Sequence, residues 1–116
     1  MHTSCELLEG SILDPAVLGR AMAGVDAVVH LAARPSVPRS IQDPGASHEA
    51  NATGTLRVLE AARATGRSPL VIVASSSSVY GANPALPKDE SMLPMPMSPY
   101  AVSKLATEQY AIAWQH

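Results

Sequence analysis

The sequence predicts an α/β fold in which parallel strands are joined by helical crossovers. Two short valine-rich runs, residues 27–31 and 70–74, are bounded by small or polar residues, as strands buried on both faces usually are. Each run is followed by a segment with helical periodicity, over residues 44–65 and 99–114. Strands that alternate with helices in this way indicate a parallel sheet.

A further strand and helix are expected at the start of the chain. Residues 5–9 (CELLE) are typical of a short strand. Asp14 followed by Pro15 provides an N-cap and a first-turn proline, so a helix begins there and ends at Gly24.

Two proline-rich segments, residues 34–45 and 81–99, are predicted to be loops. Polar or small residues stand where the two valine-rich strands end, at His30–Ala33 and Ser75–Ser78. Ligands of open parallel sheets bind just beyond the carboxyl ends of the strands. We therefore expect the functional site at these two positions.

Composition excludes several classes of partner. The formal net charge of −2 gives no basic surface for nucleic acid or for a membrane. No apolar stretch approaches the ~20 residues of a membrane span, and the first residues do not have the pattern of a signal peptide. Cys5 is the only cysteine, which fits a reducing compartment, so we expect a cytoplasmic protein. His2, His48 and His116 lack the spacing of metal ligands, and no metal is predicted.

Tyr100 and Lys104 stand one helical turn apart in SPYAVSKLATEQY (98–110). Residues four apart share one face of a helix, so the ammonium lies beside the phenol. A free tyrosine titrates near pH ~10, and a neighbouring cation favours its phenolate form. The pair is therefore a candidate for acid/base catalysis. The serine run offers hydroxyls for the same substrate oxygen, an arrangement suited to oxidising an alcohol to a ketone.

The residues alone leave other interpretations open. Tyrosine and lysine at this spacing also occur by chance on surface helices, and the serines also fit a polar strand end. A Ser-His-Asp hydrolase is disfavoured because the chain has no Gly-x-Ser-x-Gly sequence. His30, within a buried strand end, is interpreted as structural.

Four segments, in the same order, resemble the extended short-chain dehydrogenase/reductase family, specifically its nucleotide-sugar epimerases and dehydratases. They are VDAVVHLAA (25–33), NATGT (51–55), ASSSSVYG (74–81) and SPYAVSKLATEQYA (98–111). SVPRSIQDP (36–44) and NPALPKDE (83–90) look most like the 4-epimerases of UDP-hexoses and UDP-N-acetylhexosamines. The resemblance implies NAD as the cofactor, a UDP-hexose as the substrate and transient oxidation at C4.

The resemblance also implies roles for individual residues. Tyr100 would take the proton from the sugar 4-hydroxyl, Lys104 would hold the nicotinamide ribose, and Ser76 would complete the triad. Substrate contacts are implied for Ser36, Ser76, Ser77, Ser78 and Tyr100. Cofactor contacts are implied for Ser11, Ile12, Leu31, Ala32, Ala33, Asn51, Tyr100 and Lys104. Ser11 stands where the family commonly has an aspartate against the adenine, and is a departure from the pattern.

Parts of the family pattern are missing from these residues. The glycine-rich turn that grips the pyrophosphate has no counterpart, nor has the C-terminal substrate part. We therefore predict one partial Rossmann-like, doubly wound parallel domain over 1–116, with strands 3, 4 and 5 and the helices after them. In the strand order 3-2-1-4-5-6, strand 3 does not adjoin strand 4. Residues 1–24 are accordingly expected to be loosely attached or repacked.

The resemblance implies a homodimer, since family members usually pair through helices equivalent to 44–65 and 99–115. Two alternatives to a 4-epimerase stand beside it. One is a nucleotide-sugar dehydratase or decarboxylase of the same family, and the other is a catalytically inactive fragment that serves as a binding or assembly module. A dehydratase usually carries Asp-Glu directly after the catalytic hydroxyl, where this chain has Ser77 and Ser78.

Overall fold

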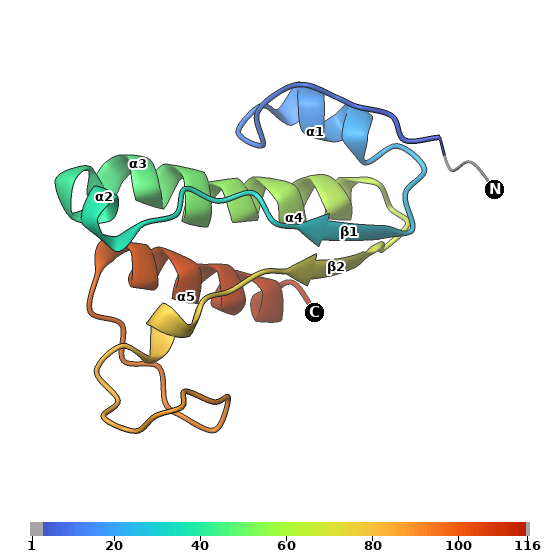
Figure 1. Cartoon of the computed structure of the whole chain (residues 1–116). Helices are drawn as coiled ribbons and strands as arrows, with labels where there is room; N and C mark the ends of the chain where they lie inside the picture. Colours follow the sequence, from blue (N-terminus) through green and yellow to red (C-terminus); the bar gives the residue numbers. More distant parts are fainter. Residues whose placement is uncertain (1–3, 116) are drawn as a thin grey trace.

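The computed structural model describes residues 4–115 and builds an α/β arrangement around a parallel pair of strands (Figure 1). In chain order the elements are α1 (Pro15–Ala21), β1 (Ala27–His30), α2 (Val37–Gln42), α3 (Pro44–His48), the π-helical turn η1 (Glu49–Thr53), α4 (Gly54–Ala64), β2 (Leu70–Val73), the 3₁₀ turn η2 (Ser77–Tyr80) and α5 (Pro99–Ala113). The predicted α/β class is confirmed.

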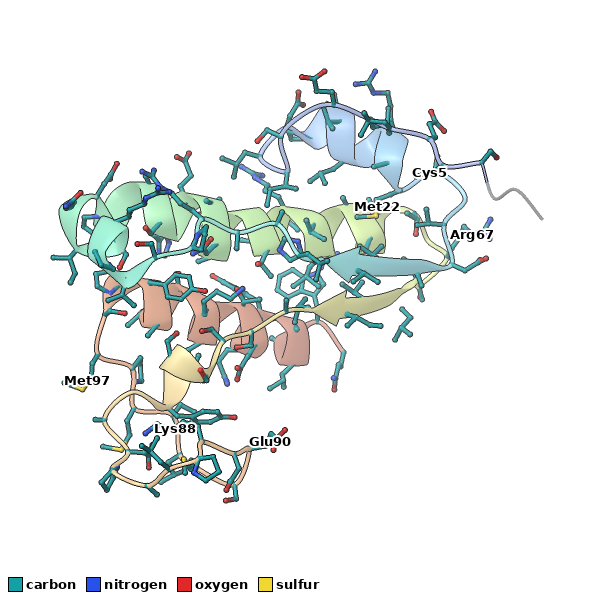
Figure 2. The ribbon with its side chains drawn as sticks, in the orientation of Figure 1. Cys5, Met22, Arg67, Lys88, Glu90 and Met97 are labelled. Atoms are coloured by element: carbon teal, nitrogen blue, oxygen red, sulfur yellow. The ribbon has the colours of Figure 1, made fainter. Side chains whose placement is uncertain are left out.

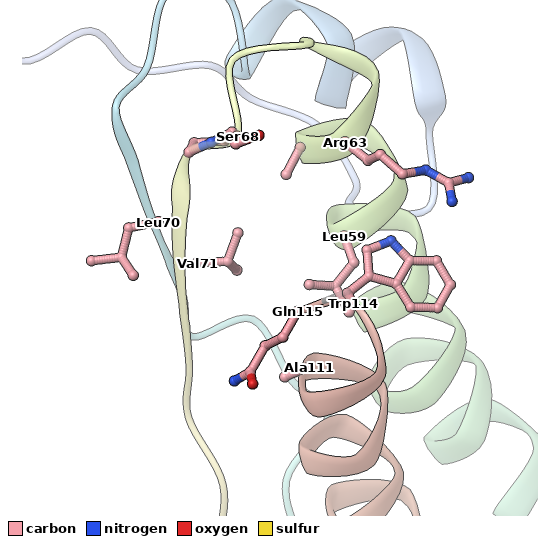
Figure 3. A pocket seen from close by; sticks show the side chains of 10 residues that line it. Leu59, Arg63, Ser68, Leu70, Val71, Ala111, Trp114 and Gln115 are labelled. Carbon is pink, nitrogen blue, oxygen red and sulfur yellow. The ribbon is translucent and has the colours of Figure 1, made fainter.

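The two strands pair in parallel, with Ala27 opposite Leu70 and His30 opposite Val73. Alternate residues of β2 point to opposite sides: Val71 faces α4 and α5, and Leu70 points away from both (Figure 3). On the side away from the helices, Val29 and Ile72 are 60% and 51% exposed. Both long helices therefore cover one face of the sheet, and they bring their side chains to the strand ends.

The core lies between α1, α4 and the covered face of the sheet. Leu18 and Met22 of the α1 region pack against Val58 and Ala62 of α4, and Met22 lies between α1 and α4 in Figure 2. Asp14 begins α1 as predicted, since its carboxylate accepts from the Ala16 amide at 2.9 Å. The core therefore holds α1 firmly in place.

The predicted strand at residues 5–9 is wrong. These residues have no regular secondary structure, and all of them are exposed. A strand needs a partner for its backbone donors and acceptors, and the described residues offer none beside this segment. The expectation that residues 1–24 are loosely attached or repacked stays a prediction. Within this range, α1 packs into the core through Leu18.

The predicted loop at residues 34–45 is also wrong in part, because residues 37–42 form α2, while Pro44 and Gly45 begin α3 within the helix predicted over 44–65. Pro38 stands in the first turn of α2 and Pro44 in the first turn of α3, where a missing N–H costs no hydrogen bond, and Pro35 directly precedes the N-cap of α2. Ser36 and Asp43 supply the N-caps, accepting from the amides of Arg39 and Ala46. The proline cluster marks two helix starts here.

The helix predicted over 44–65 is present but is not a single α-helix. It consists of α3, η1 and α4, and the π-turn at Glu49–Thr53 adds one residue to the helical repeat. Gly54 allows a close contact, because a Cβ there would stand 2.5 Å from Ile12 Cδ1. The glycine of NATGT is thus explained by packing.

The segment between η2 and α5 projects from the rest of the molecule as a long loop, as predicted (Figure 1). At its base the Met95 amide donates to the Val79 carbonyl oxygen at 2.8 Å, and the Ala82 amide donates to the Met95 carbonyl oxygen at 3.1 Å. Gly81 permits this close approach, because a Cβ there would lie 2.5 Å from the Met95 carbonyl oxygen. Lys88 and Glu90 lie in this loop (Figure 2). Within residues 4–115, no helix has the length and apolar character that a bilayer crossing requires.

Candidate functional site

The first half of α5 is joined to the chain that leaves β2. Lys104 is only 5% exposed, and its Nζ donates to the Ala74 carbonyl oxygen at 2.6 Å. One turn later, Glu108 accepts a hydrogen bond from the Ser75 hydroxyl. Lysine and glutamate on one face of the helix therefore hold the two residues that directly precede Ser76.

Ser76 caps the short turn η2 and keeps its own proton for another partner. Its Oγ accepts from the Ser78 amide at 3.2 Å and from the Ser78 hydroxyl at 2.8 Å. A serine hydroxyl has one donor and two acceptor sites, so these bonds leave the Ser76 O–H free to donate. Ser77 is exposed beside it. The arrangement can present a hydroxyl donor to a substrate oxygen.

Tyr100 is fixed in the first turn of α5 by two serines. Ser98 is the N-cap and accepts from the Ala101 amide at 3.0 Å. The Tyr100 amide donates to Ser40 Oγ of α2, also at 3.0 Å. Because Lys104 follows four residues later, the phenol and the ammonium share one face of the helix. The backbone that carries Tyr100 is thereby set from two sides.

The residues that follow β1 leave an exposed backbone at the carboxyl end of the sheet. Leu31, Ala32 and Ala33 are all exposed, and two of them have the small side chains that allow close approach. Asn51 holds the residue after them: Arg34 N–H donates to Asn51 Oδ1 at 2.7 Å, and Asn51 Nδ2 donates to Arg34 O at 3.1 Å.

The second Nδ2 proton of Asn51 goes to Ser103 Oγ at 2.9 Å. Ser103 in turn donates to the Tyr100 carbonyl oxygen at 2.7 Å. Asn51 is buried, so its side chain acts within the protein. It ties the segment after β1 to the helix that carries Tyr100 and Lys104.

Three other predicted positions, Ser11, Ile12 and Ser36, make local contacts in the structure. Ser11 is exposed and its hydroxyl accepts from the Leu13 amide at 3.1 Å. Ile12 is half-buried and packs against the core and over Gly54. Ser36 caps α2 with a φ of 100°, a backbone conformation that non-glycine residues rarely adopt.

Burial lowers the pKa of two side chains at the site, Lys104 and His30. Burial lowers the pKa of the Lys104 ammonium, and the attraction of Glu108 partly opposes this. His30 shares a 3.0 Å hydrogen bond with the Thr55 hydroxyl, and its pKa is lowered by burial and, to a smaller extent, by the charge of Lys104. His30 is therefore held neutral beside the lysine.

Two hollows flank the sheet. A hollow of about 340 Å³ lies next to the serine run, with Tyr80, Lys88 and Glu108 in its wall. A larger one, of about 490 Å³, lies between the start of β2 and the C-terminal halves of α4 and α5, beside Trp114 (Figure 3). The smaller hollow adjoins the candidate site.

These groups fit the nicotinamide end of a dinucleotide cofactor. The backbone at 31–33 is open to an approaching ligand, and Lys104 Nζ has protons left after its bond to Ala74. The pyrophosphate end has no glycine-rich turn here. Among residues 4–115, no three or more His, Cys, Asp or Glu side chains gather as a metal site would require. His2 and His116 lie outside the described residues.

Several residues of the site were not predicted from the sequence. They are Ser40, Thr55, Ser103, Thr107 and Glu108. Four of the five are uncharged hydroxyl residues, which no spacing rule separates from surface serines and threonines. Glu108 is four residues after Lys104, and this i, i+4 spacing was the one available signal.

Comparison with known proteins gives one family and several activities. The sequence model of the NAD dependent epimerase/dehydratase family matches residues 1–116. A GDP-6-deoxy-D-mannose reductase of Pseudomonas aeruginosa is 42% identical over 106 residues, covering 89% of this chain and 35% of the relative. A UDP-glucose 4-epimerase of Mycolicibacterium smegmatis is also 42% identical over 106 residues, covering 90% of this chain and 34% of the relative.

Among solved structures, a UDP-glucose 4-epimerase from Brucella ovis in complex with NAD superposes with a TM-score of 0.84 at 38% identity. The match covers 93% of this chain and 35% of that one. The chain thus spans about a third of the length of the curated relatives it matches. The resemblance inferred from the four segments is confirmed, and so is NAD as the cofactor of the family.

Proposed function

We propose that this chain, which belongs to the NAD dependent epimerase/dehydratase family, forms the central part of an active site for the 4-epimerisation of a UDP-hexose. One observation carries the proposal. The bond from Lys104 to Ala74 joins the helix of Tyr100 to the strand end two residues before Ser76. A general base, a hydroxyl donor and a cation are thus supplied by two segments that are tied together.

Each residue has a distinct task in this proposal. Tyr100 removes the proton from the sugar 4-hydroxyl, and Ser76 donates a hydrogen bond to the same oxygen. Lys104 holds the nicotinamide ribose with the protons that Ala74 does not use. NAD, when bound, supplies the acceptor for the hydride from C4. Ser36, Ser77 and Ser78 line the sugar.

The cofactor is proposed to lie along the carboxyl ends of the strands. Leu31, Ala32 and Ala33 contact it through their exposed backbone, and Asn51 acts on it by fixing the residue that follows them. Ser11 and Ile12 are proposed at the adenine. The hydroxyl of Ser11 already accepts one local hydrogen bond, so it offers the adenine amine less than a carboxylate would.

A reductase is the second candidate, because the Pseudomonas relative matches as well as the epimerase does. A reductase consumes one reduced cofactor for each turnover, whereas an epimerase returns it. A dehydratase is less well supported, since Ser77 and Ser78 occupy the positions where an acidic pair would follow Ser76. A non-catalytic binding or assembly module remains the alternative for the isolated chain.

The proposal includes a cytoplasmic homodimer that pairs through helices 44–65 and 99–115. Val102 and Ile112 of α5, each 53% exposed, offer apolar surface for such an interface. Light scattering after size exclusion, at several concentrations, measures the mass directly. A monomeric mass throughout would remove the dimer.

Calorimetry on the 116-residue chain, with NAD and then UDP-glucose, separates an active-site fragment from an assembly module. The activity itself is tested in a chimera, in which this chain replaces the matching third of the Mycolicibacterium 4-epimerase. Tyr100→Phe should reduce turnover at least about 10²-fold and leave NAD binding intact.

Tyr110→Phe is the matched control, because Tyr110 lies on the same helix but packs edge-on against Trp114, 6.1 Å between ring centres. It should leave turnover unchanged. Full activity of the Tyr100 variant would contradict the proposed role. Stoichiometric oxidation of NADH or NADPH during turnover would favour the reductase.

A further inference from the structure

Ser40 is buried completely and uses both functions of its hydroxyl. Its exposed fraction is 0%, its Oγ donates to the Val37 carbonyl oxygen at 2.7 Å, and the same oxygen accepts from the Tyr100 amide at 3.0 Å. Ser40 and Tyr100 are 60 positions apart in the sequence. Ser40 therefore joins α2 to the start of α5.

The Tyr100 amide needs such a partner. The first amides of a helix have no acceptor within it, and Tyr100 is the second residue of α5. The N-cap serves its neighbours: Ser98 Oγ accepts from Ala101 and Ser98 O accepts from Val102. The bond to Ser40 thus completes the first turn of the helix and comes from another element.

Ser36 is the N-cap of α2, the short helix that contains Ser40. The Ser40 amide donates to the Ser36 carbonyl oxygen at 3.1 Å, and Ser36 has the unusual φ of 100°. Backbone in such a conformation persists only where its surroundings fix it, and it is frequent at functional sites. Ser40 is therefore bonded to the backbone of Ser36 and to the backbone of Tyr100.

We propose that Ser40 is a positioning residue, which sets the phenol of Tyr100 relative to the Ser36 side of the substrate pocket. The inference rests on the proposed function, since it assigns Tyr100 and Ser36 to one site. Ser40 itself does not contact substrate. Its side chain is completely buried and its hydroxyl proton is used by Val37 O, so it acts through the backbone that carries the reacting group.

The first test uses the 116-residue chain and needs no activity. Hydrogen exchange is measured by NMR at the Tyr100 amide in the Ser40→Ala, Ser40→Thr and Ser98→Ala variants. Ser40→Ala should speed exchange at Tyr100 by about tenfold or more, because its acceptor is lost. Ser40→Thr keeps the hydroxyl and should restore protection. Ser98→Ala should act on the Ala101 amide instead.

The second test measures kinetics in the 4-epimerase chimera. Ser40→Ala should lower kcat by roughly 10- to 100-fold with KM for the sugar nucleotide nearly unchanged, since misplacing a reacting group costs rate more than binding. Ser40→Thr should recover kcat. Ser98→Ala removes a cap from the same helix without releasing the Tyr100 amide, and is the control for helix stability.

An unchanged exchange rate of the Tyr100 amide in Ser40→Ala would overturn the inference that Ser40 Oγ protects this amide. An equal loss of kcat in Ser40→Ala and Ser98→Ala, or no rescue by threonine, would overturn the positioning role. If the unmodified chimera has no turnover, the proposed function fails. The exchange measurement still decides whether Ser40 holds the Tyr100 amide. The two failures are thus distinguishable.

Discussion

Substitution of Gly54 tests the packing that joins the N-terminal segment to α4. An added Cβ at this position would stand 2.5 Å from Ile12 Cδ1 and 3.3 Å from Ile12 Cγ1. Inserting a carbon into such a contact costs about 1–3 kcal/mol. Alanine in place of glycine within a helix returns about 0.8–1 kcal/mol. Gly54→Ala should therefore destabilise the protein by up to about 2 kcal/mol.

The same substitution should become less destabilising when Ile12 is shortened. Ile12→Val removes the Cδ1 atom and by itself costs about 0.5–1.5 kcal/mol. Valine removes the 2.5 Å contact and leaves only the 3.3 Å contact to Cγ1, so Gly54→Ala should then cost at least about 1 kcal/mol less than it does beside isoleucine. The double-mutant cycle isolates this coupling from the helix propensity of alanine.

Urea unfolding, followed by the fluorescence of the single tryptophan and by circular dichroism, measures these differences. Gly19→Ala is the matched control, because Gly19 lies in α1 with nothing within 4 Å of an added Cβ. It should stabilise by about 0.8–1 kcal/mol in either background. If Gly54→Ala behaves like Gly19→Ala, the contact between Ile12 and α4 does not exist.

Two further predictions concern buried polar groups. Burial, and secondarily the charge of Lys104, lowers the pKa of His30 below the ordinary 6.5, so the unfolded chain binds more protons below that pH. Stability, measured as the urea midpoint, should therefore fall as pH drops through 6.5. His30→Gln should flatten this pH dependence. His48→Gln, at an exposed position, is the control and should leave it unchanged. Asn51→Ala leaves buried partners unpaired and should cost about 1–3 kcal/mol in urea unfolding. Asn83→Ala, in the projecting loop, should cost less, and equal losses would contradict the importance of the Asn51 contacts.

The strands and the two long helices could be predicted because their signals are local. Valine-rich runs and three-four periodicity report on the burial of each segment by itself, and the pairing of β1 with β2 follows from the α/β alternation. Residues 5–9 were also predicted as a strand, but they have no regular secondary structure and no strand beside them among the described residues. A strand depends on a second segment, which no composition of five residues can supply.

The helix α2 shows the opposite error. Proline is read as a breaker, yet at the first turn of a helix it removes no hydrogen bond. Deciding between these outcomes requires knowing whether the residues after the proline find a surface to pack on. Here Ser40 of α2 is completely buried and its hydroxyl accepts from the Tyr100 amide of α5, a contact that stabilises this short helix.

The sequence by itself determined the chemistry available to this protein: a tyrosine and a lysine one turn apart, a run of serines after a strand, and small residues after another. These follow from residue identity and from the helical repeat. Only the tertiary structure decided which backbone groups hold them, because Lys104 reaches Ala74, Asn51 reaches Arg34 and Ser40 reaches Tyr100 across 17 to 60 residues. Each of these hydrogen bonds joins residues far apart in the sequence, so it exists only once the tertiary fold has brought its two partners together.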